Sequence, residues 1–273
     1  MAILTIDDLK KATPKQVEDA LAGISILGDL QTYREWLLRN RQQVDIQFSI
    51  GGEDRSLGLH PSSLSKVGGC PLKLQWEITG EVEPIESFSH DMEDTYDIGT
   101  AYHKMLQATL HSMYGEQFQS EVKLSIPELM LTGSADGLFT FSGYRFLLEI
   151  KTAKEGDSQY GFNALSKKPL ADHVRQVTPY MKGLNVPFAL LFYFCKNNSM
   201  KIEHVVKYDG VVWEELRAVA EPIIKAVESG VRVQPKPGFD CQRCQFLHGC
   251  DAGKGRNNAD EKSSRRWSGK GSR

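Results

Sequence analysis

The chain has 273 residues, of which 40% are hydrophobic and 25% are charged. That is enough for one substantial core with appended segments. The formal net charge is −2, so any contact with nucleic acid must come from local basic patches and not from a global positive field. The N-terminus has no basic stretch followed by an apolar one. We therefore expect no signal peptide, no membrane span and a cytoplasmic location.

The hydrophobic pattern predicts a helical N-terminal extension over residues 1–60. Apolar residues recur at roughly helical spacing up to about residue 45, with breaks at Gly23 and Gly28, and a short strand or linker follows over 46–60. Another helix is expected to begin near Pro61.

This helix is expected to carry the Cys70–Pro71 pair, and an acidic surface loop is expected over 81–97. Further along, helices are predicted over 97–114, 170–184 and 211–229, and strands over 119–126, 129–133, 136–142, 144–151, 188–194 and 201–208. This order predicts an α/β fold in which helices flank a central mixed sheet.

The last segment, 251–273, is rich in Gly, Ser and Asn, has no apolar periodicity and carries an excess of Lys and Arg. It is predicted to be a disordered basic tail. Such a tail either keeps the protein soluble or acts as a weak phosphate-binding arm.

Two acidic residues lie on strand-like segments that would pair as a hairpin through residues 142–144. They are Asp136 and Glu149. Because side chains alternate along a strand, Glu149 and Lys151 point the same way while Ile150 turns into the core. Two carboxylates converging on Mg²⁺ or Mn²⁺, with a lysine near the attacking water, are what phosphodiester hydrolysis requires.

A Glu-x-Lys pair on a strand is by itself common, and it usually lies on a solvated face. Here the surrounding segment 146–150 is apolar on both faces, so Glu149 and Lys151 are charges at a place where charge is costly. Costly charges in a hairpin, with an aspartate on the partner strand, favour a functional site.

Three of the five cysteines lie within ten residues of each other. Cys241, Cys244 and Cys250 form a C-x₂-C-x₅-C pattern, which is typical of thiolates that wrap a soft metal centre. Cys70 is the best candidate for a fourth ligand, whereas Cys195 lies in an apolar strand as a buried free thiol. Zinc held by four cysteines, or by three cysteines and His248, competes with an iron–sulfur cluster, and spacing alone does not separate them.

Taken together, these segments resemble the PD-(D/E)XK nuclease superfamily, and specifically its iron–sulfur branch, which contains Cas4 and the AddB-type nuclease domains. The resemblance covers about residues 62–250. It is carried by the Cys70–Pro71 pair, the later three-cysteine loop and the following short motifs: 99–103 (Gly-Thr-Ala-Tyr-His), 133–136 (Gly-Ser-Ala-Asp), 149–151 (Glu-Ile-Lys) and 176–180 (Gln-Val-Thr-Pro-Tyr).

The resemblance implies a restriction-endonuclease-like nuclease domain over 61–250, closed by a cysteine-bound [4Fe–4S] cluster. It implies that His103, Asp136, Glu149 and the Ile150 carbonyl hold Mg²⁺ or Mn²⁺, and that Lys151 activates the attacking water. Gln176 and Tyr180 would brace the site. The expected ligands of the cluster are Cys70, Cys241, Cys244 and Cys250.

DNA is the expected partner, as single strands or duplex ends, with phage or host recombination proteins as further partners. The candidate backbone contacts are Lys66, Lys73, Lys167, Lys168, Arg175 and Arg243, and the candidate stacking groups are Trp76, Tyr102 and Phe246.

Nearly seventy residues precede the first cysteine, which differs from compact Cas4 proteins. A stand-alone exonuclease of phage or mobile-element origin is therefore the leading hypothesis. The alternatives are a Cas4-type enzyme that processes DNA ends in CRISPR systems and a non-catalytic DNA-binding protein whose four cysteines hold a structural metal.

Overall fold

The computed structural model describes residues 2–46, 56–66, 68–85, 90–141, 143–238, 241 and 243–254, with backbone alone for 90–93. The helices are α1 (Ile6–Lys11), α2 (Pro14–Gly23), α3 (Leu27–Asn40), α4 (Pro61–Leu64), α5 (Pro71–Thr79), α6 (His90–Tyr114), α7 (Phe162–Leu165), α8 (Ala171–Gly183) and α9 (Gly210–Glu228). The strands are β1 (Phe118–Ile126), β2 (Leu131–Thr140), β3 (Arg145–Ala153), β4 (Phe188–Cys195) and β5 (Lys201–Lys207).

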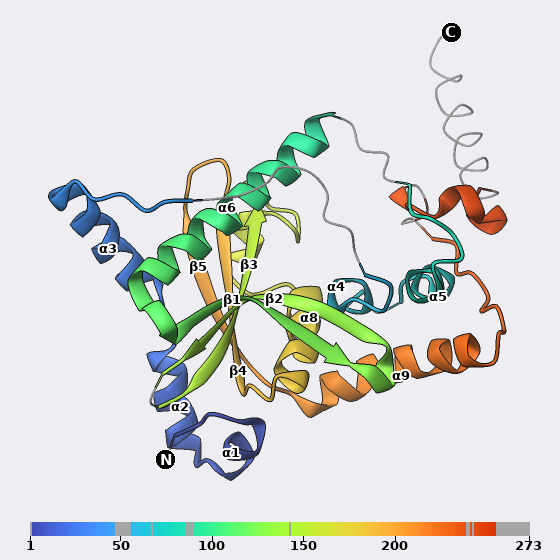
Figure 1. Cartoon of the computed structure of the whole chain (residues 1–273), viewed down its shortest axis with the longest axis horizontal. Helices are drawn as coiled ribbons and strands as arrows, with labels where there is room; N and C mark the ends of the chain where they lie inside the picture. Colours follow the sequence, from blue (N-terminus) through green and yellow to red (C-terminus); the bar gives the residue numbers. More distant parts are fainter. Residues whose placement is uncertain are drawn as a thin grey trace, which may run out of the picture.

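The strands form one mixed sheet in the order β1-β2-β3-β4-β5. β3 and β4 are parallel, and the other neighbouring pairs are antiparallel. A parallel pair needs a crossover, and here the chain between β3 and β4 contains α7 and α8. The predicted α/β fold, with helices flanking a central mixed sheet, is confirmed (Figure 1).

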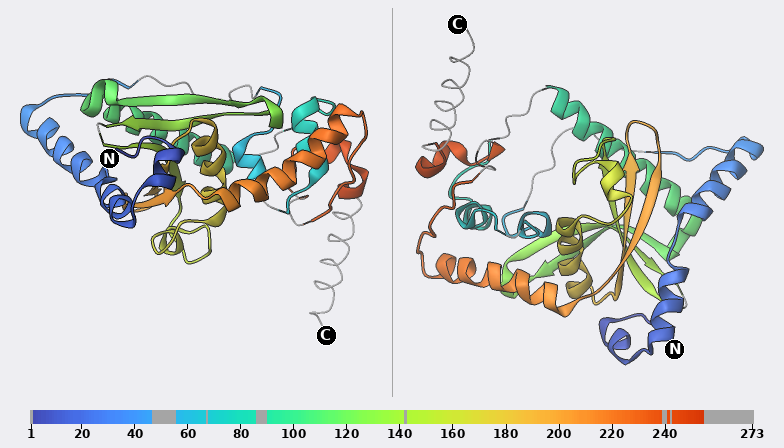
Figure 2. Two further views of the ribbon diagram at one scale, coloured as in Figure 1. Left: turned by 90° about the horizontal axis from the view of Figure 1, so that it is seen from below. Right: turned by 180° about the vertical axis from the view of Figure 1, so that it is seen from behind.

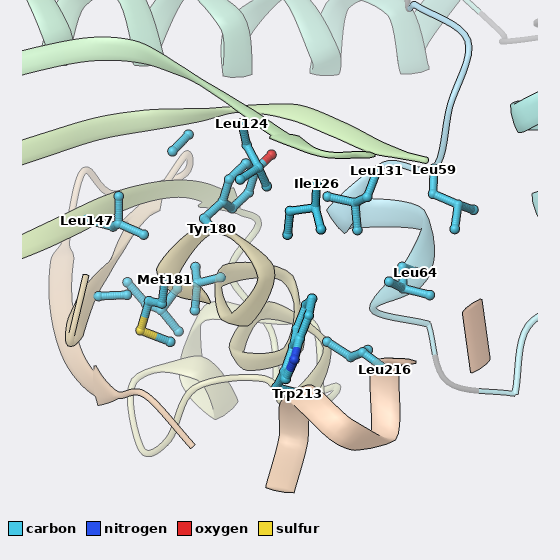
Figure 3. Close-up of a cluster of buried hydrophobic side chains, with 14 of the residues drawn as sticks. Leu59, Leu64, Leu124, Ile126, Leu131, Leu147, Tyr180, Met181, Trp213 and Leu216 are labelled. Carbon is cyan, nitrogen blue, oxygen red and sulfur yellow. The ribbon is translucent and has the colours of Figure 1, made fainter. Parts of the chain in front are cut away.

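Each face of the sheet is covered by its own hydrophobic cluster. On one face, side chains of α8 and α9 pack against β2 and β3, with Tyr180, Met181, Trp213 and Leu216 among them (Figure 3). The opposite face is covered by α6 and by the N-terminal helices, and the two layers of helices are seen in the turned views (Figure 2). The sheet is therefore sealed on both faces, and a charged side chain reaching into it needs a polar partner.

The N-terminal extension is part of this second layer. Ile3 donates its backbone N–H to the Gly143 carbonyl at 2.9 Å, and Ile26 and Leu30 are buried beside α6. Glu203 of β5 accepts hydrogen bonds from the Ile26 N–H (2.9 Å) and the Ser25 hydroxyl. The predicted break at Gly28 is wrong, because Gly28 lies inside α3.

The segment around the first cysteine differs from the prediction. The helix that begins at Pro61 ends at Leu64, and Gly68 has a φ of +91°, which a helix does not accommodate. Cys70 is the N-cap of the separate helix α5, with Pro71 at its first position. The first cysteine thus sits at the start of a helix and not within one.

Two further predicted boundaries are wrong. Helix α6 begins at His90, so the predicted acidic loop is helical from residue 90 onward. Acidic residues near a helix start are favourable because they face the positive end of its dipole. The strands predicted over 129–133 and 136–142 form the single strand β2, preceded by a 3₁₀ turn at Pro127–Leu129.

Some predictions fall outside the described residues. These are the strand or linker over 47–55 and the tail from residue 255 onward. Among the described helices, none is both long enough and apolar enough to cross a bilayer.

Candidate active site

The candidate site lies where strands β2 and β3 separate. Their antiparallel pairing begins at the hairpin end and stops at Gly137 opposite Leu148. Asp136 and Glu149 are the next residue on each strand, so both carboxylates lie at the fork. The Asp136 Oδ2 accepts the backbone N–H of Ile150 at 2.6 Å. A side chain thereby provides a partner for a backbone donor just beyond the end of the β2–β3 ladder.

Glu149 and Lys151 share one face of β3, as the strand alternation predicts, while Ile150 is fully buried on the other face. Lys151 Nζ lies 2.7 Å from Glu149 Oε1. The Glu149 side chain is only 5% exposed and that of Lys151 is 23% exposed. The ion pair therefore lies inside the molecule, which confirms that these charges are not a solvated surface pair.

Gln176 of α8 connects the two charges of this pair. Its Nε2 donates to Glu149 Oε1 at 2.7 Å, and its Oε1 accepts from Lys151 Nζ at 2.9 Å. Both polar atoms of the Gln176 amide form hydrogen bonds, so α8 holds Glu149 and Lys151 in one orientation.

Tyr180, one turn further along α8, packs against β2 near Gly133. It is buried in the hydrophobic cluster beneath β2, and its hydroxyl would be 2.8 Å from a Cβ placed at Gly133. Glycine at 133 thus leaves room for the tyrosine ring, and Tyr180 fixes α8 against β2. Pro179 does not interrupt the helix.

His103 reaches the site from α6, on the side of Asp136. Its Nδ1 lies 3.4 Å from Asp136 Oδ1. Burial alone would lower the pKa of His103, but the carboxylates of Asp136 and Glu149 raise it above its ordinary value. The imidazole and the two carboxylates thus form one electrostatic unit.

The pKa values of the two acids move apart, as expected for carboxylates that share one site. Burial raises the pKa of Glu149, and Asp136 adds to the rise against the pull of Lys151. Burial would also raise the pKa of Asp136, but His103, Lys151 and the Ile150 N–H hold it below its ordinary value. Lys151 keeps a raised pKa despite burial, because Glu149 and Asp136 favour its charged form.

The structure therefore brings together His103, Asp136, Glu149, Lys151 and Gln176 from α6, β2, β3 and α8. The predicted role of the Ile150 carbonyl stays a prediction. Within the described part of the chain, no three His, Cys, Asp or Glu side chains are already gathered into a metal-binding group. The acids at the fork are instead held by Lys151, Gln176 and the Ile150 N–H.

Two sets of neighbours were not predicted from the sequence. Gln107 donates hydrogen bonds to the Asp136 main-chain carbonyl and to the Glu121 carboxylate. His173, one turn before Gln176, shares a 2.9 Å hydrogen bond with the hydroxyl of Tyr193, which is the β4 partner of Lys151. The only sequence signal for Gln107 is its position four residues after His103 on one helix face.

The cysteine region lies around α5 and the segment after α9. Cys70, Cys244 and Cys250 pack against the buried cluster of Leu72, Trp76 and Phe246. Three sulfurs accept backbone N–H groups: Cys70 from Lys236 (3.4 Å), Cys241 from Gly238 (3.3 Å) and Cys250 from Gly253 (3.4 Å). Burial raises the pKa of Cys244, and Cys241 and Cys70 are close enough to add to the rise. Cys195 is fully buried in β4, as predicted.

The predicted stacking groups are wrong. Trp76 and Phe246 are each 2% exposed and lie against one another, and Tyr102 is 6% exposed and stacks on Phe194. Their aromatic surface stabilises the protein interior and is not available to a base.

The predicted backbone contacts are of two kinds. Lys73 and Arg175 are tied to Glu77 and Asp172. The others have exposed side chains, namely Lys66, Lys167, Lys168 and Arg243. Their contact with DNA stays a prediction.

Comparison with solved structures gives distant likenesses. No protein-family model and no curated protein matches the chain. Among solved structures, the protein SSO0001 has a TM-score of 0.47 at 17% identity, over 82% of this chain and 94% of that one. An alkaline exonuclease from Laribacter hongkongensis, LHK-Exo, has a TM-score of 0.46 at 12% identity, and its complex with dAMP has 0.46 at 15%. Each covers 63% of this chain and 89% of the other.

Proposed function

We propose that this chain is a Mg²⁺- or Mn²⁺-dependent nuclease that hydrolyses phosphodiester bonds of DNA at single strands or duplex ends. The observation that carries the proposal is the buried Glu149–Lys151 pair, fixed by Gln176, beside Asp136 at the fork of β2 and β3. A buried, hydrogen-bonded ion pair of this kind is costly to build, and strongly perturbed pKa values cluster at functional sites.

The donor set fits a hard divalent cation. Asp136 and Glu149 supply carboxylate oxygens, the ligands that Mg²⁺ and Mn²⁺ prefer in proteins, and His103 adds an imidazole nitrogen on the side of Asp136. Burial raises the pKa of Glu149, and the nearby Asp136 adds to the rise. A cation held by the two acids would offset both the burial of their charge and their mutual repulsion. A bound cation supplies positive charge at the scissile phosphate and makes a water molecule a better nucleophile at neutral pH.

The remaining two residues, Lys151 and Gln176, stabilise the developing charge and fix the orientation of the site. Lys151 keeps its proton, because Glu149 and Asp136 raise its pKa, and so presents a fixed positive charge. Such a charge stabilises the negative charge that develops on the phosphate oxygens as water attacks. Gln176 prevents Lys151 from rotating away by accepting one of its N–H groups.

The four cysteines hold a structural [4Fe–4S] cluster in this proposal, which closes the fold by joining the start of α5 to the segment after α9. Backbone N–H groups directed at sulfur are a means by which proteins stabilise such clusters, and Cys70, Cys241 and Cys250 each have one. Zinc bound by the same thiolates is the alternative. Purification under anaerobic conditions, followed by iron, sulfide and zinc analysis and a visible spectrum, separates the two.

The experiment that tests the nuclease is cleavage of end-labelled single-stranded DNA with Mn²⁺, Mg²⁺ or EDTA. Asp136→Asn and Lys151→Met are expected to reduce cleavage at least 100-fold. Asp209→Asn is the matched control, because Asp209 also accepts a backbone N–H, from Val211 at 2.8 Å, but at the start of α9.

Undiminished cleavage by either site variant would refute the assignment. Binding of DNA without cleavage in any divalent ion would favour the non-catalytic alternative.

A further inference from the structure

Helix α6 carries two residues toward Asp136, and the second has no assigned role. Gln107 lies one turn after His103, and it is only 4% exposed. Its Nε2 donates to the Asp136 main-chain carbonyl at 2.9 Å and to Glu121 Oε1 at 3.0 Å. Both hydrogens of the amide nitrogen are therefore used, one on the main chain of a proposed metal ligand.

Glu121 anchors this amide from strand β1. Its carboxylate accepts hydrogen bonds from Lys104 Nζ (2.9 Å), Gln107 Nε2 (3.0 Å) and Ser134 Oγ (3.1 Å). Its backbone has a φ of +53°, which costs a non-glycine residue about 1–3 kcal/mol. Three side chains thus hold a strained residue beside Asp136.

The location explains why support is needed there. β1 pairs with β2 at Ser120–Gly137 and Val122–Ala135, and the ladder skips Glu121 and Asp136 between them. On the other side, pairing of β2 with β3 has ended at Gly137. Asp136 therefore sits where the sheet holds the main chain least on both sides, while its carboxylate must be placed to within a fraction of an ångström.

We infer that Gln107 is a positioning residue for the proposed reaction: it fixes the main chain of Asp136 from α6, with Glu121 orienting its amide. This rests on the proposed function. Gln107 and Gln176 are then counterparts, one on each face of the sheet. Gln107, on α6, holds Asp136. Gln176, on α8, holds Glu149 and Lys151.

A buried glutamine can also be purely structural, and the chain provides that control. Gln75 is equally buried at 4% exposure. It accepts the Val233 N–H at 2.9 Å and donates to the Val231 carbonyl at 2.7 Å. Neither valine belongs to the candidate site. Gln75→Leu and Gln107→Leu each remove two hydrogen bonds of a buried amide, at the same burial.

The test compares these two variants of the full chain in three measurements. They are Mn²⁺ binding by electron paramagnetic resonance, the Mn²⁺ dependence of DNA cleavage, and hydrogen exchange of the Ile150 amide by nuclear magnetic resonance. Gln107→Leu is expected to weaken Mn²⁺ binding 10- to 100-fold, the range found for residues that support metal ligands. It is also expected to speed exchange at Ile150 at least tenfold, because the Asp136 carboxylate that accepts this N–H becomes mobile.

Gln75→Leu is expected to leave Mn²⁺ binding within twofold of the wild type and to leave exchange at Ile150 unchanged. Glu121→Gln, which keeps an acceptor oxygen for Gln107, is expected to fall between the wild type and Gln107→Leu. Wild-type Mn²⁺ binding in folded Gln107→Leu, or an equal loss in Gln75→Leu, would overturn the inference.

The exchange measurement needs neither metal nor substrate. If the wild type neither binds Mn²⁺ nor cleaves DNA, the proposed function fails. If exchange at Ile150 is the same in wild type and Gln107→Leu, the positioning role fails on its own.

Discussion

The Asp136 carboxylate accepts the backbone N–H of Ile150 at 2.6 Å, across two strands that have already stopped pairing. One oxygen of Asp136 is thereby committed to the fold, and the other lies toward His103. Asp136 has a structural task and a proposed chemical one, and substitutions can separate them.

Asp136→Asn and Asp136→Ala should differ in stability and agree in activity. Asparagine keeps an oxygen that can accept the Ile150 N–H, whereas alanine leaves this N–H without its acceptor, which costs about 1–3 kcal/mol for a buried group. Urea unfolding of both variants measures the difference, and DNA cleavage should be lost in both. Equal stability of the two variants would mean that the hydrogen bond contributes nothing to folding.

Gln176→Leu should lower the cleavage rate 10- to 100-fold, because Lys151 loses one of the two partners that orient it. The loss should lie in kcat more than in KM, since Lys151 acts on charge that develops in the transition state. Lys182→Gln, an exposed change on the same helix, should retain the wild-type rate. An unchanged kcat in Gln176→Leu would show that Gln176 has no role in the reaction.

His173 should make the fold sensitive to mild acid. Burial, with a smaller effect of Lys151, lowers the pKa of His173 to about 3, against about 6.5 in an unfolded chain. Since the unfolded chain takes up the proton first, stability falls as pH drops from 6.5 toward 3, by up to about 1.4 kcal/mol per pH unit.

Urea unfolding of wild type and His173→Gln between pH 5.0 and 6.5 tests this. This window lies above the ordinary pKa values of the carboxyl groups. The wild type should lose stability across it, and the variant should have a shallower slope. Identical slopes would show that His173 is protonated in the folded protein as readily as in the unfolded chain.

The N-terminal extension should behave as part of the core. Leu30 and Leu38 lie on the same helix, α3, but Leu30 is 4% exposed and Leu38 is 80% exposed. Leu30→Ala should destabilise the protein by about 2–5 kcal/mol, and Leu38→Ala should change stability by less than about 0.5 kcal/mol. Thermal unfolding of the pair measures both. Equal, small effects would show that α3 is not docked in solution.

Much of the site could be predicted because it follows from local pattern. The period of two along β3 places Glu149 and Lys151 on one face, and the apolar residues around them predict a buried strand. Spacing on α8 predicts that Gln176 and Tyr180 share a helix face. The structure places Gln176 against Glu149 and buries Tyr180 in the hydrophobic cluster.

The rest depends on contacts between distant segments. Gln107 and Glu121 belong to no motif, and their meaning arises from how α6 lies across β1 and β2. The burial of Trp76 and Phe246 likewise follows from α5 meeting the segment after α9, which no local pattern in either segment specifies. Tertiary contacts determine the roles of these residues, and sequence periodicity does not predict such contacts.

The left-handed backbone of Glu121 has one more consequence. Among the described strands, β1 is at an edge of the sheet, and the outer N–H and C=O groups of an edge strand can pair with a strand from another molecule. The left-handed residue within β1, with the charged side chains of Glu121 and Lys123 exposed, makes that edge a poor template. The same residue that supports Asp136 thus protects the protein from edge-to-edge aggregation.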